Sequence, residues 1–83
     1  MSYKIALKKS VARDLKKIDK DQVDRILKRI EEELPEKAET FPELTGKLSG
    51  LRKFRVGDYR AIYSIVGDTA LILRISHRRE LYR

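Results

Sequence analysis

The sequence predicts a small α+β domain with an N-terminal strand, a two-helix hairpin and a three-stranded antiparallel meander. Three observations lead to this prediction. Apolar and polar residues alternate over residues 3–8, apolar residues recur at helical spacing over residues 11–34, and the tripeptide Val-Gly-Asp separates β-rich runs at residues 56–58 and 66–68. A helical hairpin that covers one face of such a sheet gives a two-layer architecture.

The first strand and the first helix are short. An amphipathic strand is expected at residues 3–8, because the alternation there has the period of a half-buried strand. Ser10 is the expected N-cap of the following helix, since a Ser hydroxyl accepts a hydrogen bond from a first-turn N–H. This helix runs to about Ile18, and its apolar residues lie three or four positions apart: Val11, Leu15 and Ile18.

The second helix is longer. Asp21 with Asp24 resembles an acidic capping box, and one face is apolar through Val23, Ile26, Leu27, Ile30 and Leu34. Pro35 is expected to end or kink the helix at Leu34. Successive helix positions point in different directions, which favours a solvated face over an acid–base or metal site for four carboxylates: Glu31, Glu32, Glu33 and Glu36.

The remainder of the chain predicts a packed loop and the meander. Residues 41–51 hold one Pro and two Gly among spaced apolar residues. Strands are expected at residues 51–56, 59–66 and 69–76, joined by two Gly-Asp turns. Gly suits the first central position of a type II′ turn, because that position requires a positive φ.

The two-residue turns fix which side chains share a sheet face. Counting back from the first turn puts Lys53, Arg55 and Arg60 on one face, with Arg55 directly opposite Arg60. Counting from the second turn, where Val66 pairs with Thr69, adds three apolar residues to that cationic face: Leu71, Leu73 and Ile75. The other face is expected to meet the helices and carries a second apolar set: Phe54, Val56, Ala61, Tyr63, Ile65 and Ile72.

The facing pair of Arg55 and Arg60 calls for a compensating interaction. Like charges directly opposite destabilise a sheet by a few tenths to about 1 kcal/mol. A bound phosphate would compensate for this cost. The alternatives are that both guanidinium groups extend into solvent, or that a nearby carboxylate such as Asp58 or Glu80 neutralises them.

Composition excludes several classes of protein. The 83 residues predict one domain over residues 1–83. The absence of Cys excludes disulfides, thiolate zinc sites and cysteine nucleophiles, and a single His cannot build a conventional metal site, so neither metal nor cofactor is expected. No signal-peptide pattern and no run of roughly 18 to 20 apolar residues is present, so we expect a cytoplasmic protein with no membrane partner.

The net charge of +7 indicates a polyanionic partner, and it is unevenly distributed. Residues 1–50 hold 12 basic and 10 acidic side chains, whereas residues 51–83 hold 8 basic and 3 acidic ones. Seven of the last eight basic residues are Arg, the better ligand for phosphate and for stacking on bases. The chain also lacks Asn and has one Gln, a composition typical of thermophiles.

The C-terminal residues 76–83 form a basic segment with a titratable His77 and a Tyr, Tyr82. Such an end taken alone is usually solvated and frayed. Here it follows directly on the strand beside the cationic face. Its side chains and those of the cationic face are therefore expected to converge on one phosphodiester.

Three segments resemble the RelE/ParE toxin superfamily, and its RelE branch in particular. They are Lys47–Leu51, the Arg-x-Gly-x-Tyr-Arg motif within residues 52–63, and the terminal His-Arg-Arg-Glu-x-Tyr of residues 75–82. The resemblance extends over the whole chain and implies a RelE-like fold. It also implies the toxin of a type II toxin–antitoxin system, a ribosome-dependent mRNA endonuclease that cleaves A-site codons, inhibits translation and is neutralised by a RelB-like antitoxin.

The resemblance also implies site residues. Lys53, Arg55 and Arg60 match the basic sheet residues of the family, Arg78 or Arg79 its C-terminal Arg, and Tyr82 its terminal Tyr. His77 is a further catalytic candidate. Additional contacts with RNA are expected from Arg52, Arg74 and Arg83. The implied reaction is attack of a ribose 2′-OH on the adjacent phosphate without a metal.

Two other functions are compatible with the sequence. A ParE-like toxin would have the same fold and inhibit DNA gyrase by binding, without nuclease activity. A basic RNA-binding domain without any activity is the second, and its binding would be sensitive to salt. The terminal Tyr82 and the density of cations on one face favour the nuclease, because an inhibitor needs no base beside a phosphate site.

Overall fold

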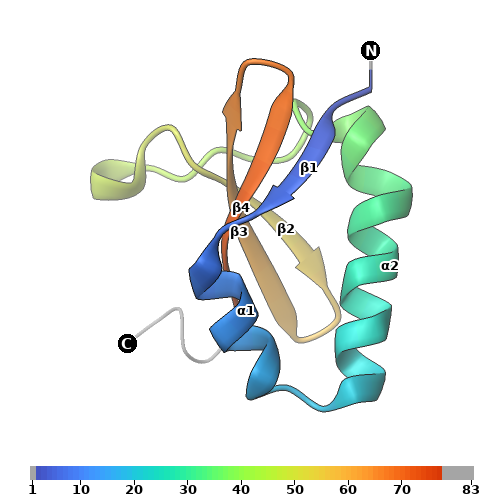
Figure 1. The fold of residues 1–83 in the computed structure, drawn as a ribbon. Coiled ribbons are helices and arrows are strands. Elements are labelled where there is room, and N and C mark those ends of the chain that lie inside the picture. Colours follow the sequence, from blue (N-terminus) through green and yellow to red (C-terminus); the bar gives the residue numbers. More distant parts are fainter. Residues whose placement is uncertain (1, 78–83) are drawn as a thin grey trace.

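The computed structural model describes residues 2–77, which form a four-stranded sheet packed against two helices (Figure 1). The elements are β1 (Lys4–Leu7), α1 (Lys9–Lys16), α2 (Lys20–Lys37), the 3₁₀ helix η1 (Gly46–Leu48), β2 (Arg52–Val56), β3 (Tyr59–Val66) and β4 (Thr69–His77). The strand order is β1-β4-β3-β2, with β1 parallel to β4 and the other pairs antiparallel. The predicted α+β architecture is confirmed.

Both helices begin earlier than expected. The residue before α1 is Lys8, and Ser10 lies inside the first turn, where its hydroxyl donates a hydrogen bond to the Leu73 carbonyl at 2.5 Å. The residue before α2 is Asp19 rather than Asp21. The N-cap positions are therefore Lys8 and Asp19, not Ser10 and Asp21, and neither Lys8 nor Asp19 caps its helix with a side-chain hydrogen bond. The Ser10 hydroxyl bonds a strand instead, because α1 lies along β4.

Pro35 does not end α2, which continues to Lys37. The expected end at Leu34 is therefore wrong. Proline removes one helix N–H, but the carbonyl that this N–H would have bonded belongs to Glu31, which is exposed and therefore accessible to solvent. Leu34 and Ala38 are fully buried and anchor the last turns of the helix in the core.

The core fills the space between the helices and one face of the sheet. Its largest fully buried side chains come from both helices and from β2, β3 and β4: Tyr63, Phe54, Ile26, Ile30, Leu34, Ile72, Ile75 and Val11. Five of the six strand residues predicted for this face are buried, and the sixth, Ile65, is partly buried and packs against the cluster. The predicted core face is thus confirmed.

Both hairpin turns have the predicted conformation. Gly57 has a φ of 59° and Gly67 a φ of 63°, and no other residue type has a positive φ in the described part of the chain. A positive φ confined to the first central position is the pattern of a type II′ turn, which only Gly adopts without strain. The register follows from these turns, with Arg55 opposite Arg60 and Val66 opposite Thr69.

The register of β3 and β4 contains an irregularity that the sequence did not reveal. Tyr63 lies opposite Ile72, but its neighbour Ile62 lies opposite Arg74, so Leu73 is an extra residue in β4. Ile75 consequently faces Ala61 and the core, where it is 1% exposed. The expectation that Ile75 supports the cationic face is wrong, because a bulge of one residue reverses the facing of every later side chain.

The loop between α2 and β2 packs at its two ends, whereas its middle, around η1, is mostly exposed, so the predicted packed loop is found only in part. Glu43 forms a β-bridge with Arg52, and the Leu44 N–H donates a hydrogen bond to the Leu51 carbonyl at 2.7 Å. The rings of Phe41 and Phe54 meet edge to face at 4.8 Å. Within residues 2–77, neither helix is long and apolar enough to cross a membrane.

The buried Tyr63 predicts a measurable alkaline transition. Its hydroxyl donates a hydrogen bond to the Ala38 carbonyl at 2.6 Å, and burial raises the pKa of Tyr63 from 10.0 to about 12. The unfolded chain therefore loses this proton first, and stability falls as pH rises from about 10 to 12. We expect Tyr63→Phe to lower the free energy of unfolding by about 1 to 3 kcal/mol at neutral pH and to weaken this alkaline loss.

Urea unfolding of both proteins at a series of pH values measures these two effects. Tyr59→Phe is the matched control and should keep the alkaline loss of the wild type, since Tyr63 is intact in it. An unchanged alkaline dependence in Tyr63→Phe would contradict the account.

Candidate functional site: a cationic sheet face

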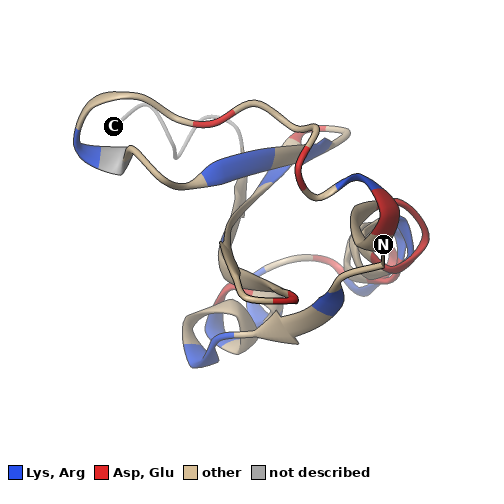
Figure 2. Ribbon diagram, turned by 90° about the horizontal axis from the view of Figure 1, so that it is seen from above, with Lys and Arg blue, Asp and Glu red and all other residues tan. Residues whose placement is uncertain are grey.

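Three cations lie on the sheet face opposite the helices. In the register of β2 and β3, Arg55 pairs with Arg60 and Lys53 with Ile62, as the sequence predicted. Arg55 is exposed, whereas Lys53 and Arg60 are partly buried. Figure 2 shows basic segments along strands of the sheet, and acidic segments together with basic ones on α2. The name "cationic face" is used below for the surface of Lys53, Arg55 and Arg60.

The end of β4 completes this face. Ser76 pairs with Arg60, so the row across the sheet reads Arg55, Arg60, Ser76. Ser76 is 6% exposed, and its Oγ has no hydrogen-bond partner among residues 2–77. A buried hydroxyl beside the two Arg residues adds a potential donor to the same side of the sheet.

The geometry of Arg55 keeps its charge on the face. Its Nε donates a hydrogen bond to the Gly57 carbonyl at 3.0 Å, within the same hairpin. This bond holds the guanidinium beside the β2–β3 turn. A phosphate placed over the hairpin would therefore meet positive charge from both strands, and charge-assisted hydrogen bonds to phosphate are among the strongest available to a protein.

Arg52 lies apart from the cationic face. Its register partner is Tyr63, which belongs to the core side of the sheet. One guanidinium nitrogen of Arg52 donates hydrogen bonds to the carbonyls of Glu39 at 3.1 Å and Phe41 at 2.7 Å. The structure thus uses this Arg to hold the loop after α2 and does not bring it together with Arg55 and Arg60.

Arg74 forms an ion pair with a buried carboxylate. Its Nε and Nη2 donate hydrogen bonds to the two oxygens of Asp14 at 2.9 and 3.1 Å, and the Ile75 backbone N–H donates to the same carboxylate at 2.9 Å. Asp14 comes from α1 and is 9% exposed. The side chain of Arg74 is therefore directed toward α1.

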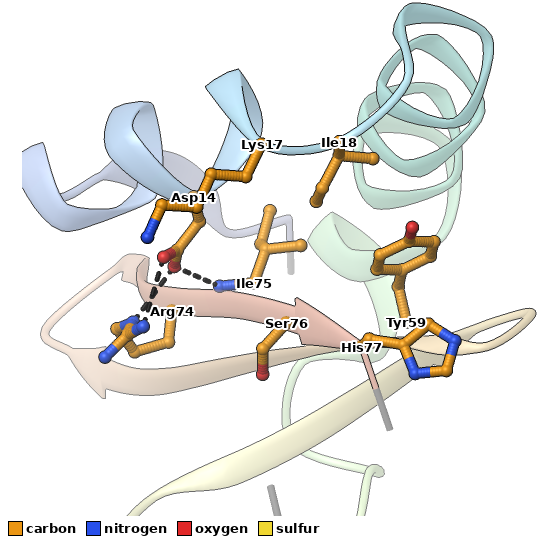
Figure 3. A pocket seen from close by; sticks show the side chains of 8 residues that line it. All are labelled: Asp14, Lys17, Ile18, Tyr59, Arg74, Ile75, Ser76 and His77. Carbon is orange, nitrogen blue, oxygen red and sulfur yellow. Dashed lines mark hydrogen bonds and ion pairs between the residues drawn. The ribbon is translucent and has the colours of Figure 1, made fainter. Parts of the chain in front are cut away.

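His77 lies on the helix side of the sheet, beside Tyr59. The two residues are register partners, and their rings meet edge to face at 5.4 Å. They border a pocket of about 280 Å³ between α1 and the end of β4, which Asp14, Lys17 and Arg74 also line (Figure 3). The register places His77 on the opposite face from Arg60, so the structure does not gather these two side chains on one surface.

The remaining candidates lie outside the described residues: Arg78, Arg79, Tyr82 and Arg83. Their assignment stays a prediction from the sequence. Among residues 2–77, no group of three or more His, Cys, Asp or Glu side chains could hold a metal ion.

Sequence reasoning missed Asp14 and Ser76. The signal for Asp14 was present, since it lies three residues after Val11 and four before Ile18, within the apolar stripe of α1. A carboxylate at such a position needs a buried partner. Ser76 carried no comparable signal, because its facing depends on the bulge.

The sequence matches a protein family model. Residues 5–82 match the model described as the ParE toxin of the type II toxin–antitoxin system parDE. The chain belongs to the RelE/ParE superfamily of type II toxins. No curated protein sequence matches it.

Solved structures of both branches of the superfamily resemble this toxin. The RelBE2 toxin–antitoxin complex of Mycobacterium tuberculosis is 26% identical with a TM-score of 0.87, and the match covers 94% of this chain and 100% of that one. The RelE–RelB complex of Pyrococcus horikoshii is 33% identical with a TM-score of 0.64, and the match covers 94% and 97%. A chromosomal ParDE system of Pseudomonas aeruginosa is 18% identical with a TM-score of 0.76 over 92% and 96%, which shows the shared fold.

The facing Arg pair of this toxin predicts a gain in stability when one charge is removed. We expect Arg55→Gln to raise the free energy of unfolding by a few tenths to about 1 kcal/mol at low ionic strength, and by less at high salt, because salt screens the repulsion. Urea unfolding at two salt concentrations measures the effect. Arg25→Gln, on the exposed surface of α2, removes the same charge away from the sheet and should change stability less. Greater loss of stability in Arg55→Gln than in Arg25→Gln would contradict this prediction.

Proposed function

We propose that this toxin is a ribosome-dependent, metal-independent endoribonuclease that cleaves mRNA in the A site and so inhibits translation. The observation that carries the proposal is the cationic face, where Arg55 and Arg60 lie directly opposite each other beside Lys53. Like charges directly opposite each other disfavour a sheet, and a bound anion would offset this repulsion. The phosphodiester of RNA is the anion that the charge and the strand geometry suit.

The proposed chemistry is a transesterification. The ribose 2′-oxygen attacks the adjacent phosphorus as its proton passes to a base, and the bond from phosphorus to the 5′-oxygen breaks. The products are a 2′,3′-cyclic phosphate and a 5′-hydroxyl. The reaction needs a proton acceptor, positive charge for the pentacovalent phosphate and a proton donor for the leaving oxygen.

The residues of this chain divide these tasks. Tyr82 is the proposed base, because it matches the terminal Tyr of the family. Lys53 and Arg60 stabilise the phosphate charge, and Arg55 positions the reacting groups. Arg78 or Arg79 assists the departing 5′-oxygen.

Four further residues have assignments that depend on the mRNA path. Arg74 and Arg83 are proposed to contact the RNA backbone, and Arg52 is proposed to contact it from the start of β2, outside the cationic face. His77 is the reserve candidate for proton transfer. Its position beside Tyr59 makes it secondary to Tyr82, because the sheet separates it from Arg60.

The ribosome and an antitoxin are the proposed partners. A chain with one sheet and two helices is too small to enclose an mRNA, so the ribosome is needed to orient the mRNA over the cationic face. A cognate RelB-like antitoxin with an acidic, partly helical segment would neutralise the exposed charge. Solved relatives of this toxin include complexes of RelE-type toxins with RelB antitoxins.

Inhibition of DNA gyrase is the second candidate, because the matching family model is that of ParE toxins. Such a toxin would act by binding and would cleave no RNA. The higher identity to the RelE of Pyrococcus horikoshii than to the ParE of Pseudomonas aeruginosa, 33% against 18%, supports the nuclease.

Primer extension on a translated message distinguishes the two candidates. The purified toxin is incubated with mRNA, with and without ribosomes, and in parallel with gyrase and relaxed plasmid. We expect cleavage only within A-site codons and only with ribosomes, and unimpaired supercoiling. Blocked supercoiling without cleavage would replace the proposal by the gyrase function.

Single substitutions test the assigned roles. We expect Arg60→Ala and Tyr82→Phe each to lower the cleavage rate by about 100-fold or more, because one loses charge stabilisation and the other the base. Arg25→Ala on α2 is the matched control and should cleave at the wild-type rate. Full activity of Tyr82→Phe would show that Tyr82 is not the base and would leave His77 as the candidate. Full activity of Arg60→Ala would show that the cationic face is not part of the catalytic site.

A further inference from the structure

The second half of β4 has an open edge. β1 pairs with β4 only from Thr69 to Ile72, and its last hydrogen bond is donated by the Lys8 N–H to the Ile72 carbonyl at 3.0 Å. From Leu73 onward no strand of the described chain lies on this side of β4. Backbone groups at such an edge must find other partners.

Side chains of α1 replace the missing strand. The Ser10 hydroxyl donates a hydrogen bond to the Leu73 carbonyl at 2.5 Å, and the carboxylate of Asp14 accepts one from the Ile75 N–H at 2.9 Å. Ser10 and Asp14 are four residues apart and so lie on the same face of the helix. The carboxylate also binds Arg74 through two nitrogens (Figure 3). Three donated hydrogen bonds thus converge on one buried carboxylate at the bulge.

The bulge decides what the end of β4 presents to each side of the sheet. A regular ladder counted from the β3–β4 turn would set Ile75 opposite Arg60 and Arg74 opposite Ala61. The observed register sets Ser76 opposite Arg60 and Ile75 opposite Ala61. Without the extra residue, an apolar side chain would lie on the cationic face and a guanidinium in the core.

We propose that Asp14 is a positioning residue that holds the β4 bulge in register and thereby directs Ser76 toward the cationic face. Asp14 lies in α1, and its carboxylate accepts hydrogen bonds from Arg74 and from the Ile75 backbone of β4. Its effect passes through the backbone of Ile75 and the guanidinium of Arg74. The consequence for catalysis rests on the proposed nuclease function, whereas the consequence for the register does not.

NMR on the full chain tests the register in Asp14→Asn and Asp14→Ala. The chain has one His, so the imidazole signals belong to His77 without ambiguity. In the wild type we expect a nuclear Overhauser effect between the rings of Tyr59 and His77 and slow exchange of the Ile75 amide. In Asp14→Ala we expect this ring contact to weaken and the Ile75 amide to exchange at least tenfold faster. Asp14→Asn, which keeps one acceptor oxygen, should show an intermediate effect.

Cleavage kinetics on programmed ribosomes test the role in positioning. We expect the maximal cleavage rate of Asp14→Ala to fall at least tenfold, while the toxin concentration at half-saturation changes less than twofold. If the substitution only unfolded part of the protein, the active fraction would instead fall in proportion to the unfolded population seen by NMR. Asp68→Asn is the matched control, because Asp68 also forms an ion pair, with Lys4 at 3.6 Å, but at an exposed site in the β3–β4 turn.

The outcomes separate this inference from the proposed function. The inference would be overturned if both Asp14 variants kept the wild-type Tyr59–His77 contact and the wild-type exchange rate of the Ile75 amide. It would also be overturned if the register changed while the maximal cleavage rate did not. If Asp14→Ala does not fold, Asp14→Asn provides the same two comparisons. If the wild type cleaves no RNA, the proposed function fails, and the NMR measurements still decide whether Asp14 holds the register.

Discussion

The register of the sheet is the constraint on which the rest of this toxin depends. Two glycines with positive φ begin tight turns, and these turns fix the pairing of β2 with β3 and of β3 with β4. Because side chains alternate between faces, this pairing alone divides the strands into a core side and a cationic side. The fully buried Phe54 and Ile72 belong to the first side, and Arg55 and Arg60 to the second.

The two helices contribute to this division in different ways. α2 covers the core face with apolar side chains such as Ile26 and Ile30, which are almost fully buried. α1 also packs on the sheet, but its Ser10 and Asp14 bond the backbone of β4 where β1 has ended. One helix thus supplies hydrophobic burial, and the other supplies hydrogen bonds that set the position of the last strand.

Much of the fold could be predicted from the sequence, because local signals agree with it. The turn glycines gave the register of β2 with β3, and with it the facing of Lys53, Arg55 and Arg60. The bulge at Leu73 could not be predicted, since it depends on hydrogen bonds from Asp14, which is about sixty positions away in the chain. Counting residues from the turn therefore could not predict the sheet face on which Ile75, Ser76 and His77 lie. The predicted helix starts were also wrong, because they were read from capping residues, and neither helix has a side-chain cap.

The central claim is that the cationic face holds the phosphate that is cleaved. A cryo-electron microscopy structure of the toxin on a ribosome tests it most directly, with an mRNA whose A-site 2′-oxygens are methylated and cannot attack. The account predicts an mRNA phosphate within hydrogen-bonding distance of Arg60 and Lys53, on the sheet face opposite α1 and α2. An mRNA bound against the helices, or a toxin that does not occupy the A site, would contradict it.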